Sequence, residues 1–294
     1  MDVVVGQLLA GLSVGSVLLL AAVGMSLTFG QMGIINMAHG EFIMIGAYTV
    51  YMVQQFVSVA ALSYVIAIPC AFLLAAAVGV LLEQGVLQFM YRRPLDTLLV
   101  TFGVSLILQQ AARDIFGAPA VAINIPEFLS GHVSLLGAAI PVSRILIIVL
   151  AMVLVLLVSW LLKATQVGRR MRAVTVNREL AEVSGIPTRR TDRLTFALGS
   201  GLAGIAGVAI TLIGSTTPTL GSNYIVYAFL VVVAGGLSSI WGAVIAAVAL
   251  GIVQSAIAFG TTQSIATWVS FLLVVLFLQW RPQGIFSLKT RSLA

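Results

Sequence analysis

Three polar side chains able to exchange hydrogen bonds with a solute lie within six residues of one another: Asn36, His39 and Glu41. The stretch around them is apolar, and Glu41 is the only charged residue between Asp2 and Glu83. One histidine beside one carboxylate is too small a ligand set for a metal, and the H-E-x-x-H spacing of zinc proteases is absent. An amide such as that of Asn36 both donates and accepts hydrogen bonds. The pattern therefore favours recognition of a polar solute, without enzymatic activity, metal or cofactor.

The chain that positions these residues has the composition of a membrane protein. Of its 294 residues, 60% are hydrophobic and 8% are charged, whereas a soluble domain carries about 25% charged residues. Residues 194–280 contain no Asp, Glu, Lys, Arg or His. A helix needs about 20 apolar residues to cross the hydrocarbon core, so this stretch alone holds three or four crossings. We expect an all-α, polytopic transmembrane bundle in a single permease domain, residues 1–294.

The apolar runs of the sequence give the expected helices. We expect about eight to ten spans, with one or two helices broken near the midplane. The runs are 6–28, 41–58, 61–90, 97–116, 144–162, 194–214, 224–240, 243–260 and 265–280.

The basic residues are concentrated in one loop. Eight of the 15 lie in residues 163–193, between two apolar runs. Lys and Arg next to membrane spans gather on the cytoplasmic side, so this pattern indicates a cytoplasmic loop and does not indicate nucleic-acid binding. Arg281, Lys289 and Arg291 place the C-terminus on the same side. The segment 117–143, rich in Pro, Gly and Ser, then falls on the opposite face.

A short capped helix is predicted inside this loop. Asn177 suits the N-cap, and Glu179 in the first turn favours the helix dipole. Gly185 suits the left-handed position after the helix, and Pro187 prevents its continuation. The result is a helix of about two turns, with Ala181 small enough for close docking to a partner. The alternative is a solvated basic loop.

The spacing of Glu179, Ala181 and Gly185 resembles the EAA loop of ABC importer permeases, with Leu180 in place of the usual first Ala. In that family the loop forms a coupling helix, which sits in a groove of the ATP-binding subunit and transmits its closure to the membrane helices. The resemblance implies that the coupling residues are Asn177, Glu179, Ala181, Gly185 and Arg189.

Nearly the full chain resembles the branched-chain amino acid type of these permeases. "GMSLTFGQMGIINMAHGEFIMIGAY", "VVVAGGLSSIWGAVIAAVALGIVQ" and the ending "RPQGIF" carry this resemblance. Within this type, "YRRPLDTLLVTFGVSLILQQAARDIFGAPAV" looks most like urea-transporting permeases. Tyr227 and the pair Ser238–Ser239 depart from the urea pattern. The expected solute is urea, another short amide or a branched-chain amino acid, in that order.

The resemblance also implies partners and a location. We expect ATP-binding subunits on the cytoplasmic side, a second permease subunit in a heterodimer, and a periplasmic substrate-binding protein. The chain would lie in the lipid bilayer of a bacterial inner membrane and work by alternating access. The only lysines, Lys163 and Lys289, do not follow a glycine, so no phosphate-binding loop is present. Energy must therefore come from other chains.

Glycines next to the polar residues permit a break in a membrane helix. Gly30, Gly33 and Gly40 would allow a break, with a half-helix that begins near residues 39–41, and transporters often place such helix ends at the midplane. A second break is expected at 234–243. In both places an ordinary surface turn between two spans is the alternative. The candidate pathway residues are Asn36, His39, Gly40, Glu41, Gly236 and Ser238.

Two other classes of function compete with an importer. A passive channel for urea or water would also use polar half-helices, but it gives no reason for an arginine-rich loop with a capped helix. The other class is an intramembrane enzyme, but this sequence offers no set of catalytic or metal-binding residues for one.

Overall fold

Nine long helices follow the nine apolar runs. The computed structural model describes residues 2–91, 93–135, 138–237 and 239–286, and Ser238, Lys289 and Arg291 lie outside them. Within these ranges the long helices are α1 (Asp2–Met32), α2 (His39–Phe56), α3 (Ala60–Gly85), α4 (Pro94–Phe116), α5 (Val142–Ala164), α8 (Thr188–Ile210), α9 (Leu220–Gly235), α10 (Ile240–Gly260) and α11 (Gln263–Trp280).

The remaining elements are short. They are α6 (Gln166–Val176), α7 (Arg178–Val183), the 3-10 turns η1 (Leu87–Phe89) and η2 (Glu127–Leu129), and the strands β1 (His132–Leu135) and β2 (Ala138–Pro141). The strands form an antiparallel hairpin in which Val133 pairs with Ile140. This hairpin was not part of the all-α prediction, because strands of four residues are too short to show an alternating pattern.

Seven of the described helices are long and apolar enough to cross a membrane: α1, α3, α4, α5, α8, α10 and α11. The apolar helix α9 is shorter, with 16 residues, and α2 carries the polar residues His39 and Glu41 near its start. The predicted polytopic helical bundle is confirmed.

Helices α1 and α8 form the centre of the bundle. Among the 18 most apolar consecutive residues of each helix, 72% in α1 and 78% in α8 are buried. The corresponding share is 17–33% in α3, α4, α5, α10 and α11. The outer helices instead expose large apolar side chains, such as Leu73, Leu99 and Trp268. An exterior of this kind needs lipid or another apolar surface around it, because in water it would be a large exposed hydrophobic patch.

Small residues allow the central helices to approach closely. A Cβ on Gly11 of α1 would lie 2.7 Å from the Cα of Ile252 in α10, and one on Gly204 of α8 would lie 2.5 Å from the carbonyl oxygen of Ala71 in α3. Membrane helices commonly pack through such small residues. The stretches 11–15 and 199–207 therefore form close-contact faces between helices of the same chain.

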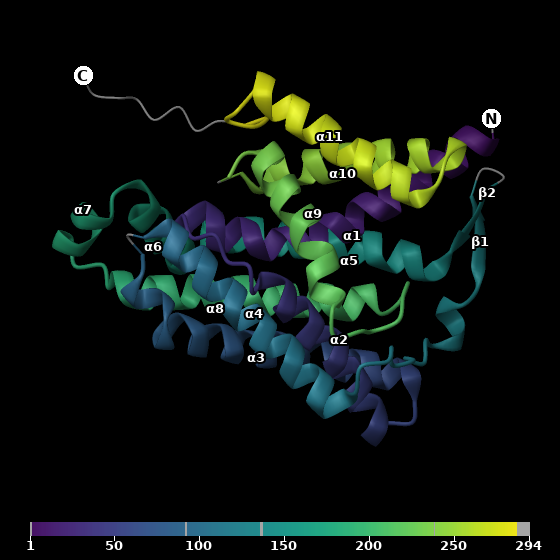
Figure 1. Cartoon of the computed structure of the whole chain (residues 1–294), viewed down its shortest axis with the longest axis horizontal. Helices are drawn as coiled ribbons and strands as arrows, with labels where there is room; N and C mark the ends of the chain where they lie inside the picture. Colours follow the sequence, from purple (N-terminus) through teal and green to yellow (C-terminus); the bar gives the residue numbers. More distant parts are fainter. Residues whose placement is uncertain (1, 92, 136–137, 238, 287–294) are drawn as a thin grey trace.

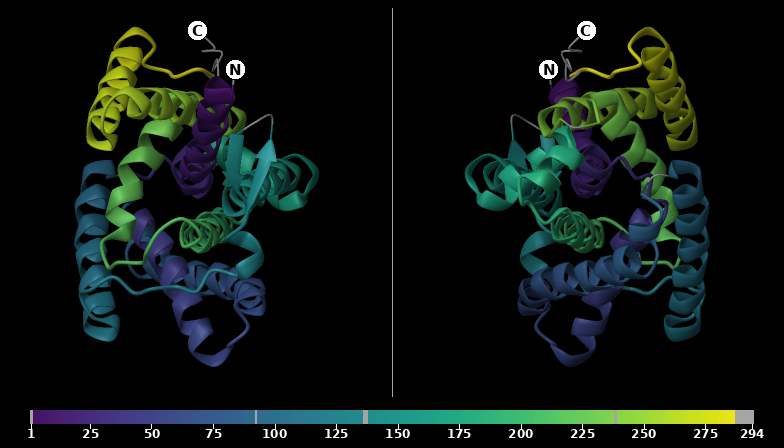
Figure 2. Two further views of the ribbon diagram at one scale, coloured as in Figure 1. Left: turned by 90° about the vertical axis from the view of Figure 1, so that its right-hand side faces the viewer. Right: turned by 90° about the vertical axis from the view of Figure 1, so that its left-hand side faces the viewer.

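The bundle has two distinct ends, which Figure 1 shows at opposite sides of the molecule. The α7 end carries α6, α7 and the last described residues, 281–286, which bond to the end of α9 through Ile285 N and Ala234 O at 2.8 Å. The hairpin end carries β1 and β2. Figure 2 looks along the bundle, with α8 nearly end-on, and shows α4 at the edge of the molecule, inclined to α8.

Candidate functional site

The connection between α1 and α2 buries Ile34, Asn36 and Ala38 inside the bundle. After α1 ends at Met32, Gly33 adopts a φ of +67°, a conformation that glycine reaches without strain. The linker then turns back toward the bundle before α2 begins (Figure 1). Asn36 is 5% exposed and Glu41 is 1% exposed. The alternative of a water-facing turn at this position is therefore wrong, because the side chains that would face water are covered by other helices.

The N-termini of α2 and α9 meet at two glycines. A Cβ on Gly40 would lie 2.5 Å from the carbonyl oxygen of Gly221, and a Cβ on Gly221 would be closer still to the carbonyl oxygen of Gly40. Each glycine is the second residue of its helix. Two helix ends thus touch backbone to backbone. The irregular segment that precedes α9 is 211–219.

The second break expected at 234–243 is instead a short turn. Helix α9 ends at Gly235 and α10 begins at Ile240, and Gly236 has a φ of +101°. Gly236 lies 15 residues beyond Gly221, or roughly 22 Å along α9. It packs under Phe286 at the α7 end, so the structure does not bring it to Asn36 or Glu41. Ser238, the other candidate there, lies outside the described residues.

A cluster of polar side chains surrounds Glu41. Its Oε1 accepts hydrogen bonds from Ser105 Oγ at 2.8 Å and from Gln109 Nε2 at 2.8 Å, both on α4. Gln109 Nε2 also lies 2.9 Å from Ser222 Oγ on α9. These four residues, the Glu41 cluster, join α2, α4 and α9. Glu41 Oε2 is buried and has no hydrogen-bond partner among the described residues.

His39 and Asn36 face different surroundings. The His39 ring is fully buried, with Nε2 3.2 Å from the carbonyl oxygen of Ala21 on α1, and its edge meets Phe42. His39 therefore lies in a helix contact. Asn36 Oδ1 accepts a hydrogen bond from Ala38 N at 3.0 Å, and Asn36 Nδ2 has no partner within the described part of the chain.

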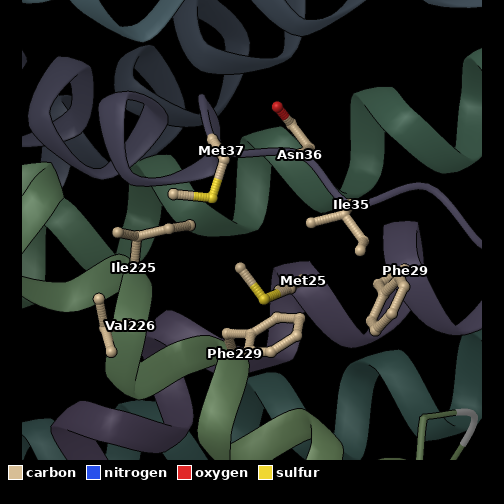
Figure 3. Close-up of a pocket in the computed structure, with 8 residues that line it drawn as sticks. All are labelled: Met25, Phe29, Ile35, Asn36, Met37, Ile225, Val226 and Phe229. Atoms are coloured by element: carbon tan, nitrogen blue, oxygen red, sulfur yellow. The ribbon is translucent and has the colours of Figure 1, made fainter. Parts of the chain in front are cut away.

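Asn36 also borders an apolar cavity of about 130 Å³ between α1, the linker and α9, here called the Asn36 cavity. Figure 3 shows its lining, with Asn36 at one edge and its side chain extending away from the apolar residues. The lining residues are Met25, Phe29, Ile35, Asn36, Met37, Ile225, Val226 and Phe229.

The capped helix predicted in the basic loop is present as α7. Asn177 Oδ1 accepts a hydrogen bond from Leu180 N at 3.0 Å, and Gly185 has a φ of +80°. One expectation about its surface is wrong. Ala181 is 4% exposed, because it faces the chain itself, whereas Leu180 is 64% exposed and Val183 is 88% exposed. The apolar side chains that α7 presents outward are thus Leu180 and Val183. Glu179 and Arg189, the other two candidates, are exposed.

Charged contacts fasten α7 to the bundle. Arg178 Nη2 lies 2.6 Å from Asp192 Oδ2 on α8, and its guanidinium lies 5.1 Å from the centre of the Tyr91 ring. The Tyr91 hydroxyl donates to Glu83 near the end of α3, and Arg193 Nε lies 3.5 Å from Glu83 Oε2. Burial, and next the bond to Glu83, raise the pKa of Tyr91, so its hydroxyl keeps its proton and donates.

Three residues of the site were not predicted from the sequence: Ser105, Gln109 and Ser222. Gln109 is 8% exposed and bonds to Glu41. A signal existed in α4, where Thr101, Ser105 and Gln109 recur every four residues and so share one helix face. In the described part of the chain, no three His, Cys, Asp or Glu residues are grouped to hold a metal ion.

Comparisons with known proteins place this architecture among transport permeases. Residues 7–278 match the family described as branched-chain amino acid transport system / permease component. The chain is similar to the high-affinity branched-chain amino acid transport system permease protein BraD of Pseudomonas aeruginosa, with 30% identity over 295 positions, covering 95% of this chain and 94% of the relative. The corresponding LivH of Escherichia coli K12 gives the same values. A probable LivH of Methanocaldococcus jannaschii is 26% identical, covering 95% and 91%. No solved structure matches significantly.

Proposed function

Since this chain belongs to the family of permease components of branched-chain amino acid transport systems, we propose that it forms half of the membrane pathway of an ATP-driven importer for a branched-chain amino acid. Its relatives are transport permeases and not enzymes. The observation that carries the proposal is the extent of the match, which covers 95% of this chain and 94% of the relative BraD and so includes both the bundle and the basic loop.

The proposed contact with the ATP-binding subunits is α7. The basic residues of 163–193 favour the cytoplasmic side for this loop and for the last described residues. Leu180 and Val183 offer exposed apolar contacts on a helix that is capped at both ends. An ion pair between Arg178 and Asp192 connects this helix to α8, so a displacement of α7 would be transmitted to a central helix of the bundle. We expect Glu179 and Arg189 to frame this contact.

The proposed solute pathway passes the junction of α2 and α9. Transporters place half-helix ends and their polar groups near the substrate, and ionisable groups inside a membrane bundle are candidates for function. Gly40 provides the close approach of the two helix ends, Asn36 and Glu41 carry unpartnered polar atoms, and His39 holds α2 against α1. Gly236 is not part of this proposal.

Urea is a second candidate solute, favoured by a specific observation. The stretch 91–121, which resembles urea permeases, supplies Ser105 and Gln109 to the Glu41 cluster. Urea is small and uncharged and carries both donors and acceptors, so it suits a polar cluster and incurs no cost of burying a charge. The similar proteins named above are all branched-chain amino acid permeases, which puts the amino acid first.

The test is uptake by the whole complex. The chain is reconstituted in liposomes with its second permease subunit, its ATP-binding subunits and its substrate-binding protein, and entry of labelled leucine and labelled urea is measured with and without internal ATP. ATP-dependent leucine uptake is expected. Uptake of urea in place of leucine would select the second candidate, and flux that is independent of ATP would indicate a passive channel and overturn the importer.

The role of α7 has its own variant. Leu180→Asp places a charge on the face proposed to contact the ATP-binding subunit, so ATP-dependent uptake is expected to fall at least tenfold. Leu95→Asp is the matched control, because Leu95 is also exposed, at 79%, but lies at the start of α4. Equal uptake by the two variants would refute α7 as the contact.

A further inference from the structure

The polar face of α4 is turned inward. Thr101, Ser105 and Gln109 are 0%, 5% and 8% exposed, whereas Leu99 and Ile107 on other faces are 70% and 68% exposed. The buried face lies along the start of α2, where Met37 N donates to Thr101 Oγ1 at 3.0 Å and Glu41 accepts from Ser105 and Gln109. A membrane helix gains nothing from burying polar groups unless they are satisfied or used.

The second carboxylate oxygen of Glu41 is left without a partner in this arrangement. Both hydrogen bonds to Glu41 reach Oε1, while Oε2 is buried and unpartnered among the described residues. A buried acceptor without a donor is costly. An N–H group of a solute would supply the missing donor. Asn36 shows the complementary feature five residues earlier, since its buried amide nitrogen is a donor without an acceptor.

The Asn36 cavity lies next to the Glu41 cluster. Met37, which lines the cavity, bonds to the same face of α4 as Glu41. Ile225, on its other side, lies one helical turn beyond Ser222. The cavity measures about 130 Å³, and an apolar cavity of about 150 Å³ holds benzene. It therefore has room for a branched side chain of three or four carbons.

These features suit one class of ligand. We propose that the Glu41 cluster and the Asn36 cavity together form a recognition site for an α-amino acid with a branched aliphatic side chain, an inference that rests on the proposed function. The amino group donates to Glu41 Oε2, the carboxylate accepts from the Asn36 amide, and the side chain enters the cavity. Urea uses the polar groups but leaves the apolar cavity empty.

In the described arrangement α4 covers Glu41. Glu41 is 1% exposed, and Ser105 and Gln109 both bond to its Oε1. The contacts of α4 with α2 beyond the cluster are mainly aromatic and apolar, such as the stacking of Phe116 on Tyr48 at 4.2 Å. Gln109 thus holds α4 on Glu41 through Oε1 and leaves Oε2 to the solute.

The test measures binding without the substrate-binding protein. The complex of the chain with its permease and ATP-binding partners is placed in lipid nanodiscs, and binding of labelled leucine is followed. Two competitors separate the parts of leucine: isoamylamine keeps the amine and the branched chain, and 4-methylpentanoate keeps the branched chain and the carboxylate. The variant at the polar cluster is Glu41→Gln. The control is Gln110→Ala, because Gln110 is exposed, follows the cluster residue Gln109 in the chain and bonds through its side chain to Asp114.

Wild type and Gln110→Ala are expected to bind leucine equally, and Glu41→Gln at least tenfold more weakly. Isoamylamine should displace leucine much better than 4-methylpentanoate does. Val226→Phe fills the cavity and changes no residue of the Glu41 cluster, so it should weaken the binding of leucine more than the binding of alanine. This variant tests the site even where Glu41→Gln fails to assemble. Leucine binding unchanged in both Glu41→Gln and Val226→Phe overturns the inference, as does equal competition by the two analogues. If the wild-type complex takes up leucine with ATP but binds no leucine in this assay, only the inference is overturned. If the wild-type complex takes up no leucine with ATP, the proposed function is overturned.

Discussion

Replacing Gly40 by alanine tests the contact on which the proposed site depends. The added Cβ would lie 2.5 Å from the carbonyl oxygen of Gly221 and 2.7 Å from its carbonyl carbon, where an ordinary contact begins at 3.4 Å. Both neighbours are backbone atoms near the start of a helix, so no side chain is able to rotate away. The N-termini of α2 and α9 must therefore separate by about 0.9 Å at this point.

Such overpacking costs about 1–3 kcal/mol, which corresponds to a fall of roughly 2–10 °C in the unfolding midpoint. The separation also draws Glu41 away from Ser222, and a shift of about 1 Å in a functional group is enough for a large loss of activity. We expect Gly40→Ala to lower ATP-driven uptake at least tenfold. Unfolding is followed in detergent or nanodiscs by intrinsic fluorescence, and uptake is measured in the reconstituted complex.

Gly103→Ala is the matched control. Gly103 lies in α4, and a Cβ there would meet no atom within 4 Å. Alanine favours a helix over glycine by about 1 kcal/mol, so this variant should unfold at the same temperature or higher and should transport normally. If Gly40→Ala behaves like Gly103→Ala in both measurements, the close contact between α2 and α9 does not exist in the working protein.

Three further predictions concern the α7 end, and each is checked by ATP-driven uptake with the ATPase rate measured in parallel. Asn177→Ala removes the cap of α7, at a cost of about 1 kcal/mol, and should lower uptake while the complex still assembles. Gly185→Ala forces a residue with a Cβ to adopt a φ of +80°, costing about 1 kcal/mol or more, with the same result. Asp192→Asn removes the charge that faces Arg178 at 2.6 Å, so more ATP should be hydrolysed for each solute moved. Asp114→Asn, an exposed change at the end of α4, should leave this ratio unchanged.

The helices and the ends of α7 were predictable because they are local properties of the sequence. An apolar run of about 20 residues, or Asn177 followed eight residues later by Gly185, carries its structural consequence within a short window. The burial of the linker at Asn36 was foreseen as one of two alternatives, since the glycines permit a break without deciding which helices cover it.

The partners of Glu41 were not predictable in the same way. Gln109 and Ser222 are 68 and 113 residues away from the residues they bond in the cluster, and nothing in a single sequence links such distant positions. The second half-helix was expected at 234–243, where glycines are dense, but it begins at Leu220 after a segment that includes Thr216 and Pro218. Ala181 was assigned to the docking face because it is small, and its small size instead lets α7 pack against its own chain.

The contact of α1 with α10 has a consequence for how the protein is made. Gly11 meets the backbone around Gly251 and Ile252, so α1 meets this neighbour only after about 240 more residues have been synthesised. At a synthesis rate of about 5–20 residues per second, that delay is roughly 12–48 s. Throughout this interval the glycine face of α1 is exposed to lipid or to membrane-insertion proteins. The packing of α1 is therefore complete only after the C-terminal quarter of the chain has been made, and until then α1 needs another partner to cover its glycine face.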